Sequence, residues 1–342
     1  MLVIVAHHFV VNSGITQSID ERITFGIGGG YDCIVILFGW GGKTAINCFV
    51  LVTGWFMCRQ EFRWRKLLSL YIEVKFYRIV IYLLFLLSGY EAFSLKEFYK
   101  AVFDVAFNFG KGFSSSFIAF YALVPFMNKF IGILDKKSHG ELIVVLTVMY
   151  SVVPTFFLNG VFEYIGWYAT LYLIAAYLRM YPSKWSESKK TSGLLSVLLL
   201  LLSWGSIACI YFVSLRFRRL LPVYWFVADS NKVLALLTSV AVFCFFKNIS
   251  LGQNRFINMI SSATFGVLLI HASSDTMRQW LWQDVCRNVW HFENDTAFYF
   301  IGYSALCTLC VFAVCVLIDL SRKFVQKQIY GLFLCLNKKQ SQ

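Results

Sequence analysis

The chain of 342 residues consists of long apolar stretches separated by short polar segments. A helix needs about 20 mostly apolar residues to cross the hydrocarbon core of a membrane. The strands of a membrane barrel would alternate apolar and polar residues, whereas these stretches are continuously apolar. The pattern therefore predicts membrane-spanning helices over 31–57, 65–89, 114–134, 141–159, 162–181, 191–214, 223–247, 256–283 and 296–320.

Three other segments depart from this pattern. Residues 1–12 are apolar apart from His7, His8 and Asn12 but are too short to cross a membrane, so we expect them to belong to a truncated tenth helix. Residues 95–108 are amphipathic and are expected to lie on the membrane surface. The polar run 229–232 is either a break that lines a cavity or a loop joined to the span 223–247. The predicted fold is an all-α, polytopic membrane helix bundle of about ten transmembrane helices, forming one domain over 1–342.

Composition supports a membrane protein. Hydrophobic residues make up 58% of the chain and charged residues 14%, whereas soluble domains are about 45–50% apolar and about 25% charged. Most of the ten cysteines fall in apolar stretches, where they pack as small hydrophobes. The pair Cys307 and Cys310 lacks a second pair or a nearby histidine, so we expect no metal site. No basic region precedes the first apolar stretch, and we therefore expect no cleavable signal peptide.

The distribution of Lys and Arg predicts the orientation of the chain. Eighteen of them lie in the loops after even-numbered spans and in the C-terminal tail, and eight lie in the opposite loops. Cytoplasmic loops carry the excess of basic residues, so we expect both termini in the cytoplasm. The basic cluster 216–219 is an exception, which indicates either a site for an anionic group or a different number of spans there. Basic loops beside anionic lipid account for most of the net charge of +13, and we expect no nucleic-acid partner.

Polar residues inside the expected spans are candidates for a functional site. An ionisable residue at the centre of a membrane helix costs about 2.5–3.5 kcal/mol, so such residues normally face the bundle interior or a wet cavity. Residues three or four apart share a helix face, and each such group can bind a substrate or pair with a neighbouring helix. The candidates are His7, His8, Lys43, Asn47, Glu73, Lys75, Arg78, His271, Asp275 and Arg278.

Four of these segments, in order, resemble motifs of the acyltransferase-3 family of integral-membrane acyltransferases. They are IVAHHF (4–9), NCFVLVTGWFM (47–57), KFYRIVIY (75–82) and FGVLLIH (265–271). The chain departs from the family pattern at Leu268, where the family has an aromatic residue, and at Lys75, where it often has Arg. The Arg of the family's first helix would lie upstream of Met1.

The resemblance implies the chemistry. Members of the family move acetyl or related groups onto sugars of bacterial surface polymers, which implies a multi-pass protein of the bacterial plasma (inner) membrane. The expected partners are acyl-CoA, a carbohydrate or glycolipid acceptor, and membrane lipid. Acetyl-CoA is expected as a donor substrate, with no tightly bound cofactor. Transporters or flippases of polysaccharide intermediates are the alternative, and they would show two similar halves with matching broken helices. A non-catalytic membrane scaffold is a third hypothesis, and it would leave His8 unexplained.

The resemblance also assigns roles to residues. It places the family's catalytic histidine at His8, and adjacent helical residues point about 100° apart, so His7 is expected to pack against a neighbouring helix. His8 is expected to act as the general base, because the pKa of a free imidazole, about 6.5, lies near working pH. The residues expected to bind the donor or the acceptor are Lys75, Arg78, Asn47, His271, Asp275 and Arg278.

Overall fold

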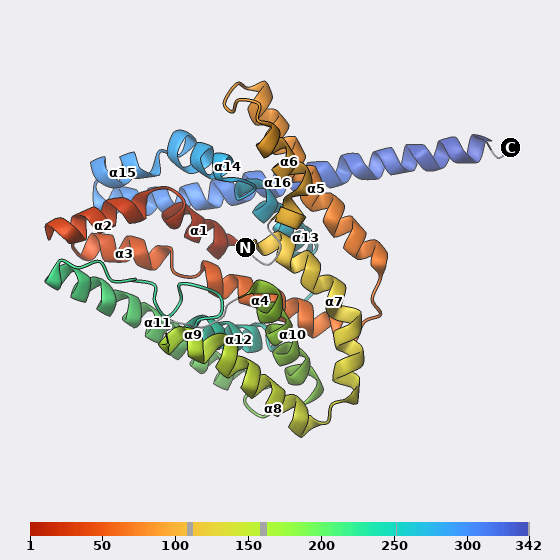
Figure 1. Cartoon of the computed structure of the whole chain (residues 1–342), viewed down its shortest axis with the longest axis horizontal. Coiled ribbons are helices and arrows are strands. Elements are labelled where there is room, and N and C mark those ends of the chain that lie inside the picture. The colour runs from red at the N-terminus through yellow and green to blue at the C-terminus, as the bar shows by residue number, and fades with distance from the viewer. Residues whose placement is uncertain (108–111, 158–162, 251, 341–342) are drawn as a thin grey trace.

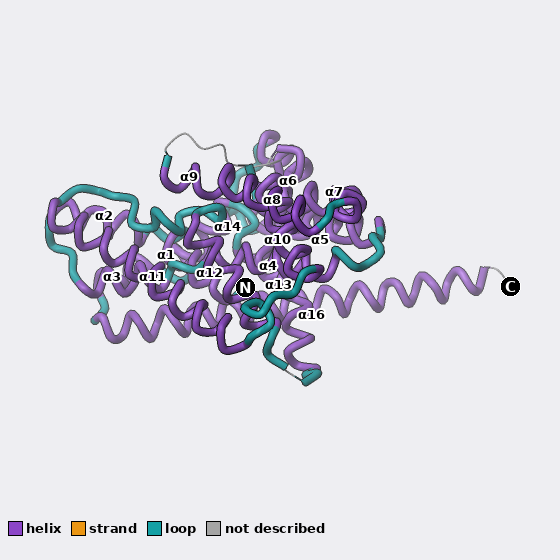
Figure 2. The backbone as a smooth tube through the Cα atoms, turned by 90° about the horizontal axis from the view of Figure 1, so that it is seen from below, coloured by secondary structure: helices purple, strands orange, loops and turns teal. Residues whose placement is uncertain are grey.

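The computed structural model describes residues 1–107, 112–157, 163–250 and 252–340. Its regular structure is helical throughout these ranges, which contain no strand (Figure 2). The all-α prediction is therefore confirmed. Long helices pack side by side, α4 against α10 and α12, and α13 against α16 (Figure 1). Met1 lies in the middle of the bundle, whereas α16 projects beyond it (Figures 1 and 2).

The helices are bounded as follows. They are α1 (Leu2–Val11), α2 (Ile15–Phe25), α3 (Gly30–Phe38), α4 (Gly42–Met57), α5 (Trp64–Leu87), α6 (Leu95–Phe107), α7 (Phe113–Ile133), α8 (Lys136–Thr147), α9 (Val153–Phe156), α10 (Tyr164–Met180), α11 (Lys189–Phe217), α12 (Val233–Lys247), α13 (Arg255–His271), α14 (Asp275–Gln279), α15 (Asn288–Asn294) and α16 (Ala297–Gln340). Two π-helical turns, Val148–Val152 and Trp280–Val285, follow α8 and α14.

The number of membrane crossings follows from length and hydropathy. Within the described residues, five segments are long and apolar enough to cross, and two bent helix pairs would raise that number to seven. The predicted polytopic bundle is thus confirmed. Three other expected spans do not meet the same test, because α5 carries charged residues in its interior and α10 and α12 have only 17 and 15 residues. The expected number of about ten is reached only if these three helices also cross.

Several expected spans are interrupted. In the segment 223–247 only α12 is helical, and residues 223–232 form turns and bends, so the polar run is a loop joined to the span. The expected span 256–283 ends at His271, where the chain bends by 98°. The expected span 31–57 is interrupted between α3 and α4. The loop at 229–232 is one of the two alternatives expected there, whereas the short breaks after Phe38 and His271 were not expected, because long apolar stretches lie on both sides of them.

Other segments also differ slightly from expectation. The first stretch continues past a bend of 51° into α2. The amphipathic segment 95–108 is α6, and its last residue lies outside the described residues. The final residues of the expected span 141–159 and the first residue of 162–181 also lie outside them.

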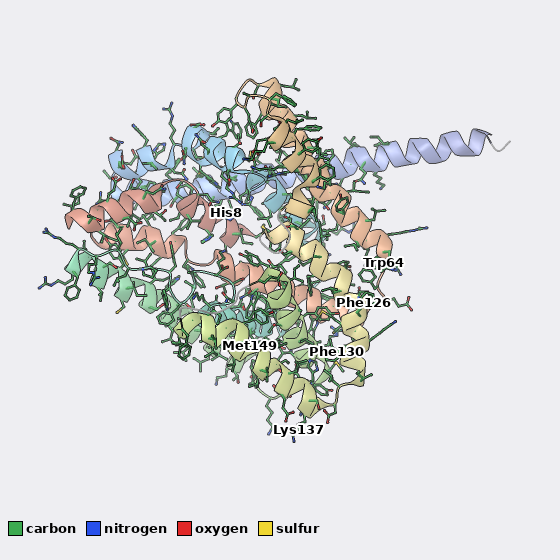
Figure 3. All side chains as sticks on the ribbon, viewed as in Figure 1. His8, Trp64, Phe126, Phe130, Lys137 and Met149 are labelled. Atoms are coloured by element: carbon green, nitrogen blue, oxygen red, sulfur yellow. The ribbon has the colours of Figure 1, made fainter. Side chains whose placement is uncertain are left out.

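Large apolar side chains cover the outside of the helices. Trp64, Phe126, Phe130 and Met149 are between 44% and 61% exposed, whereas His8 lies among the helices (Figure 3). Soluble monomers rarely expose extended apolar surface. This surface is therefore suited to lipid, and the buried polar groups face inward.

Candidate active site

The first helix holds its two histidines on different faces. His7 Nδ1 lies 2.5 Å from the carbonyl oxygen of Gly39, in the link between α3 and α4. Its ring also packs on Gly42, where an added Cβ would lie 2.3 Å from the imidazole. His8 turns toward α13, and its Nδ1 lies 2.9 Å from Nε2 of His271. The close approach of α1 to a glycine-rich link thus fixes which histidine reaches which neighbour.

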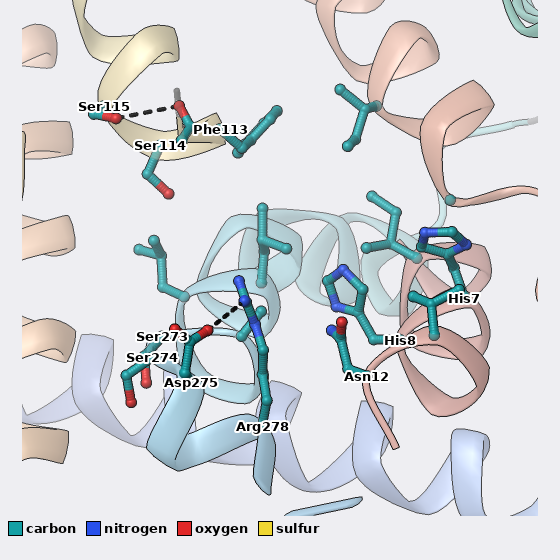
Figure 4. A pocket seen from close by; sticks show the side chains of 18 of the residues that line it. His7, His8, Asn12, Phe113, Ser114, Ser115, Ser273, Ser274, Asp275 and Arg278 are labelled. Carbon is teal, nitrogen blue, oxygen red and sulfur yellow. Dashed lines mark hydrogen bonds and ion pairs between the residues drawn. The ribbon is translucent and has the colours of Figure 1, made fainter. Parts of the chain in front are cut away.

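A cavity of about 610 Å³ lies in front of His8. Its wall is formed by α1, α4, α5, the start of α7 and the link from α13 to α14, and His8 projects into it (Figure 4). The volume is in the range of small-molecule sites. Its polar lining includes His8, Asn12, Lys43, Arg78, Ser273 and Arg278.

The structure brings some of the expected site residues to this cavity. Arg78, Asp275 and Arg278 line it together with His8. The four residues come from three helices, α1, α5 and α14. His271 does not line it and lies behind His8, fully buried. Two segments more than 200 residues apart in sequence therefore meet at one histidine pair.

Asn47 and Lys75, which were expected to bind a substrate, lie elsewhere. The fully buried amide of Asn47 donates to the carbonyl oxygen of Ser230 over 2.6 Å and accepts from Trp167 Nε1 over 3.1 Å. Lys75 Nζ donates to the carbonyl oxygen of Val102 over 2.6 Å, which ties α5 to α6. Positions three apart differ by about 60° around a helix, enough to direct Lys75 away from the cavity that Arg78 lines. Neither residue lines the cavity, and substrate binding by Asn47 and Lys75 stays a prediction from the sequence.

Cations of the cavity wall are paired with carboxylates at its edge. Arg278 Nη1 lies 2.8 Å from Oδ1 of Asp275, a side chain that is 96% exposed (Figure 4). Lys43 Nζ lies 3.1 Å from Oδ1 of Asp229 and 3.2 Å from the hydroxyl of Tyr164. Arg78 adds a third cation to the lining. Such a wall favours an anionic ligand, because three cations line the cavity together with one carboxylate, that of Asp275.

Some buried polar atoms of the lining lack a hydrogen-bond partner among the described residues. They are Asn12 Nδ2, Ser273 Oγ and Arg278 Nε. Buried polar atoms are normally hydrogen-bonded, so a ligand or an ordered water bound here would complete the bonding of this group. Asn12 lies four residues after His8 and therefore shares its helix face.

Of these residues, Arg278 was expected in the site from the sequence, whereas Asn12 and Ser273 were not. A signal existed, because Asn12 ends the first apolar stretch and Ser273 lies between two expected site residues. No group of three or more His, Cys, Asp or Glu side chains suited to a metal ion occurs in the part of the chain that the structure describes.

Comparison with known proteins identifies the family. A family model described as an acyltransferase domain matches residues 1–319. Searches of curated proteins and of solved structures each gave no match. The family match spans all the helices that form the cavity, and it agrees with the apolar helix bundle. The chain belongs to the acyltransferase-3 family and is an integral-membrane acyltransferase.

Proposed function

We propose that the chain moves an acetyl or related acyl group from acyl-CoA to a hydroxyl group of a cell-surface carbohydrate. The observation that carries the proposal is the placement of His8, whose imidazole projects from an apolar helix into a cavity lined by cations (Figure 4). A titratable side chain in such a helix is costly and is normally functional. Family membership supplies the reaction class, and the cavity supplies the groups that acyl transfer needs.

The first of these groups is the base. In the proposed step His8 takes the proton of the acceptor hydroxyl while the hydroxyl oxygen attacks the thioester carbonyl carbon. A C–O bond forms and the C–S bond breaks, so the acyl group becomes an ester of the acceptor. The thiolate of CoA then takes the proton from the imidazolium. This returns His8 to its neutral form and releases the free thiol.

The second group stabilises charge on the carbonyl oxygen during the attack. Asn12 Nδ2 and Arg278 Nε are buried donors of the cavity wall without a partner among the described residues. We assign them to the developing oxyanion, because fixed donors in a site that excludes water stabilise such charge most effectively.

The third group attracts the donor. Acyl-CoA carries several phosphate charges, and Lys43, Arg78 and Arg278 make the lining positive. Cationic walls raise the local concentration of an anionic substrate. In this proposal acetyl-CoA is a substrate that enters and leaves, and the acceptor hydroxyl approaches His8 within the same cavity.

The proposal is tested by replacing each of the first two histidines. His8→Ala should lower transfer of a radiolabelled acetyl group from acetyl-CoA into the carbohydrate of native membranes about 10²–10⁴-fold, the usual contribution of a positioned base. His7→Ala is the matched control and should cost much less, because His7 bonds to the backbone of Gly39. Both rates are normalised to the amount of protein in the membrane.

Two outcomes would contradict this assignment. Near-normal transfer by His8→Ala together with loss in His7→Ala would move the base to His7. Unchanged transfer in both variants would remove the histidine mechanism. Movement of carbohydrate across the membrane without any transfer of label would favour a transporter.

A further inference from the structure

His271 completes a chain of two hydrogen bonds behind His8. Its Nδ1 lies 2.6 Å from the carbonyl oxygen of Val267, one turn earlier in α13. Its Nε2 lies 2.9 Å from Nδ1 of His8. Both ring nitrogens of His271 are therefore occupied by protein groups, and its side chain is fully buried behind the cavity. The expected role of His271 in gripping a substrate does not fit this placement.

The direction of each proton in this chain follows from the acceptors. A carbonyl oxygen can only accept, so Nδ1 of His271 carries a proton. A fully buried imidazole is more stable neutral than charged, which leaves Nε2 of His271 as an acceptor. The contact of 2.9 Å then requires a proton on Nδ1 of His8. Consequently Nε2 of His8 holds the free lone pair.

Apolar packing keeps the two rings in this arrangement. The indole of Trp282 is fully buried, and its ring centroid lies 6.4 Å from that of His271. The same indole lies 5.9 Å from the ring of Phe9, the residue after His8. The contact between the imidazoles is thus enclosed on the side away from the cavity, where water would otherwise compete for the hydrogen bond.

We infer that His271 is a positioning residue that fixes the tautomer and orientation of His8. Its Nε2 accepts from His8 Nδ1, so the other nitrogen of His8 is kept unprotonated and turned toward the cavity. An acceptor behind a catalytic imidazole does the same in hydrolases, and it stabilises the imidazolium that forms during the reaction. The catalytic part of this inference rests on the proposed acyl transfer, whereas the tautomer does not.

The tautomer is measured directly by ¹⁵N solid-state NMR of the full chain in lipid bilayers, with only histidine labelled. The chain has five histidines, and the spectrum of His8→Ala identifies the signals of His8 by difference. Protonated and unprotonated ring nitrogens have well-separated ¹⁵N shifts. We expect a protonated Nδ1 and an unprotonated Nε2 for His8 in the wild-type chain.

Two variants of His271 separate positioning from packing. His271→Leu removes the acceptor, and we expect a population of His8 with a protonated Nε2, a fall in kcat of about 10²-fold and an unchanged KM for acetyl-CoA. His271→Gln places an amide oxygen close to the position of Nε2, so it should keep the wild-type tautomer and most of the rate. His139→Leu is the control, because His139 is also fully buried and bonded to a backbone carbonyl but lies in α8.

The inference is overturned if wild-type His8 carries its proton on Nε2, or if His271→Leu leaves the tautomer of His8 unchanged. It is also overturned if His271→Gln is as slow as His271→Leu while both variants are folded. Should His271→Leu not fold, the wild-type spectrum alone decides the tautomer. Absence of acyl transfer by the wild-type chain would refute the proposed function, and the spectrum would still test the hydrogen-bond chain.

Discussion

Arg78 and Lys75 carry the same charge on one helix, yet their surroundings differ. Arg78 lines the cavity, whereas Lys75 Nζ donates to a backbone carbonyl of α6. We predict that Arg78→Gln raises the KM for acetyl-CoA at least about tenfold, because a hydrogen bond to a charged group contributes about 1.5–3 kcal/mol. Lys75→Gln should change the KM less than about twofold, since an amide can still donate to that carbonyl.

Initial rates at varied acetyl-CoA in native membranes measure both values. A larger effect of Lys75→Gln than of Arg78→Gln would contradict the placement of the donor beside Arg78. If Arg78→Gln lowers kcat and kcat/KM by the same factor and leaves KM unchanged, Arg78 contacts the substrate only in the transition state.

The sequence predicts some residues of the site and not others, for a physical reason. Helical spacing shows which side chains share a face, and it places Asp275 with Arg278 correctly. It does not show what that face meets. Asn47 belongs to one of the candidate motifs, but its amide donates to the carbonyl oxygen of Ser230. The hydrogen bond between His8 and His271 depends on the packing of α1 against α13.

At the scale of elements, α1 is positioned by the link between α3 and α4. Added Cβ atoms on Gly39 and Gly41 would lie 2.8 Å and 2.5 Å from valine side chains of α1. A Cβ on Gly42 would lie 2.3 Å from the ring of His7. Small residues allow helices in membranes to approach closely. The contact between the ring of His7 and Gly42 therefore limits how closely α1 approaches α4.

This packing predicts a pair of variants. Gly42→Ala should push α1 away and lower acyl transfer by up to about 10²-fold, because a displacement of about 1 Å at the base has such an effect. His7→Ala in the same chain removes the ring and should restore much of the loss. Gly205→Ala in α11 is the control, since its Cβ would meet open space. A double variant no more active than Gly42→Ala would contradict this account.

The bend after α13 shows the limit of an apolar pattern as a predictor of helix length. The apolar pattern predicts that α13 and the following residues form one helix, because Trp280 to Trp282 continue the apolar character. Instead the chain bends by 98° after His271, and Ser273 and Asp275 turn toward the cavity. The polar run 273–275 marks the bend, because the Ser274 hydroxyl accepts from the Met277 N–H and caps the start of α14.

At the scale of the whole molecule, the basic cluster 216–219 and the C-terminal helix α16 lie toward opposite ends of the bundle (Figure 1). The links after α2, α11 and α15 lie at the same end of the bundle, and α16 extends from the opposite end (Figure 1). The cluster 216–219 ends α11, whose 29 residues are long enough to cross a membrane. The cluster therefore lies at the end opposite to the C-terminus, and Arg218 approaches Gly26 there.

This arrangement predicts the side on which each end of the bundle lies. An epitope tag at the C-terminus should bind antibody only after the plasma membrane is lysed, because eighteen Lys and Arg residues lie in the loops and tail assigned to that side. A tag inserted after Leu220, an exposed residue in the link that follows α11, should bind antibody on intact spheroplasts. Each tagged chain must retain acyl transfer, so that the topology belongs to folded protein. Antibody binding to the C-terminal tag on intact spheroplasts would reverse the orientation, and it would place the cationic cluster 216–219 on the cytoplasmic side.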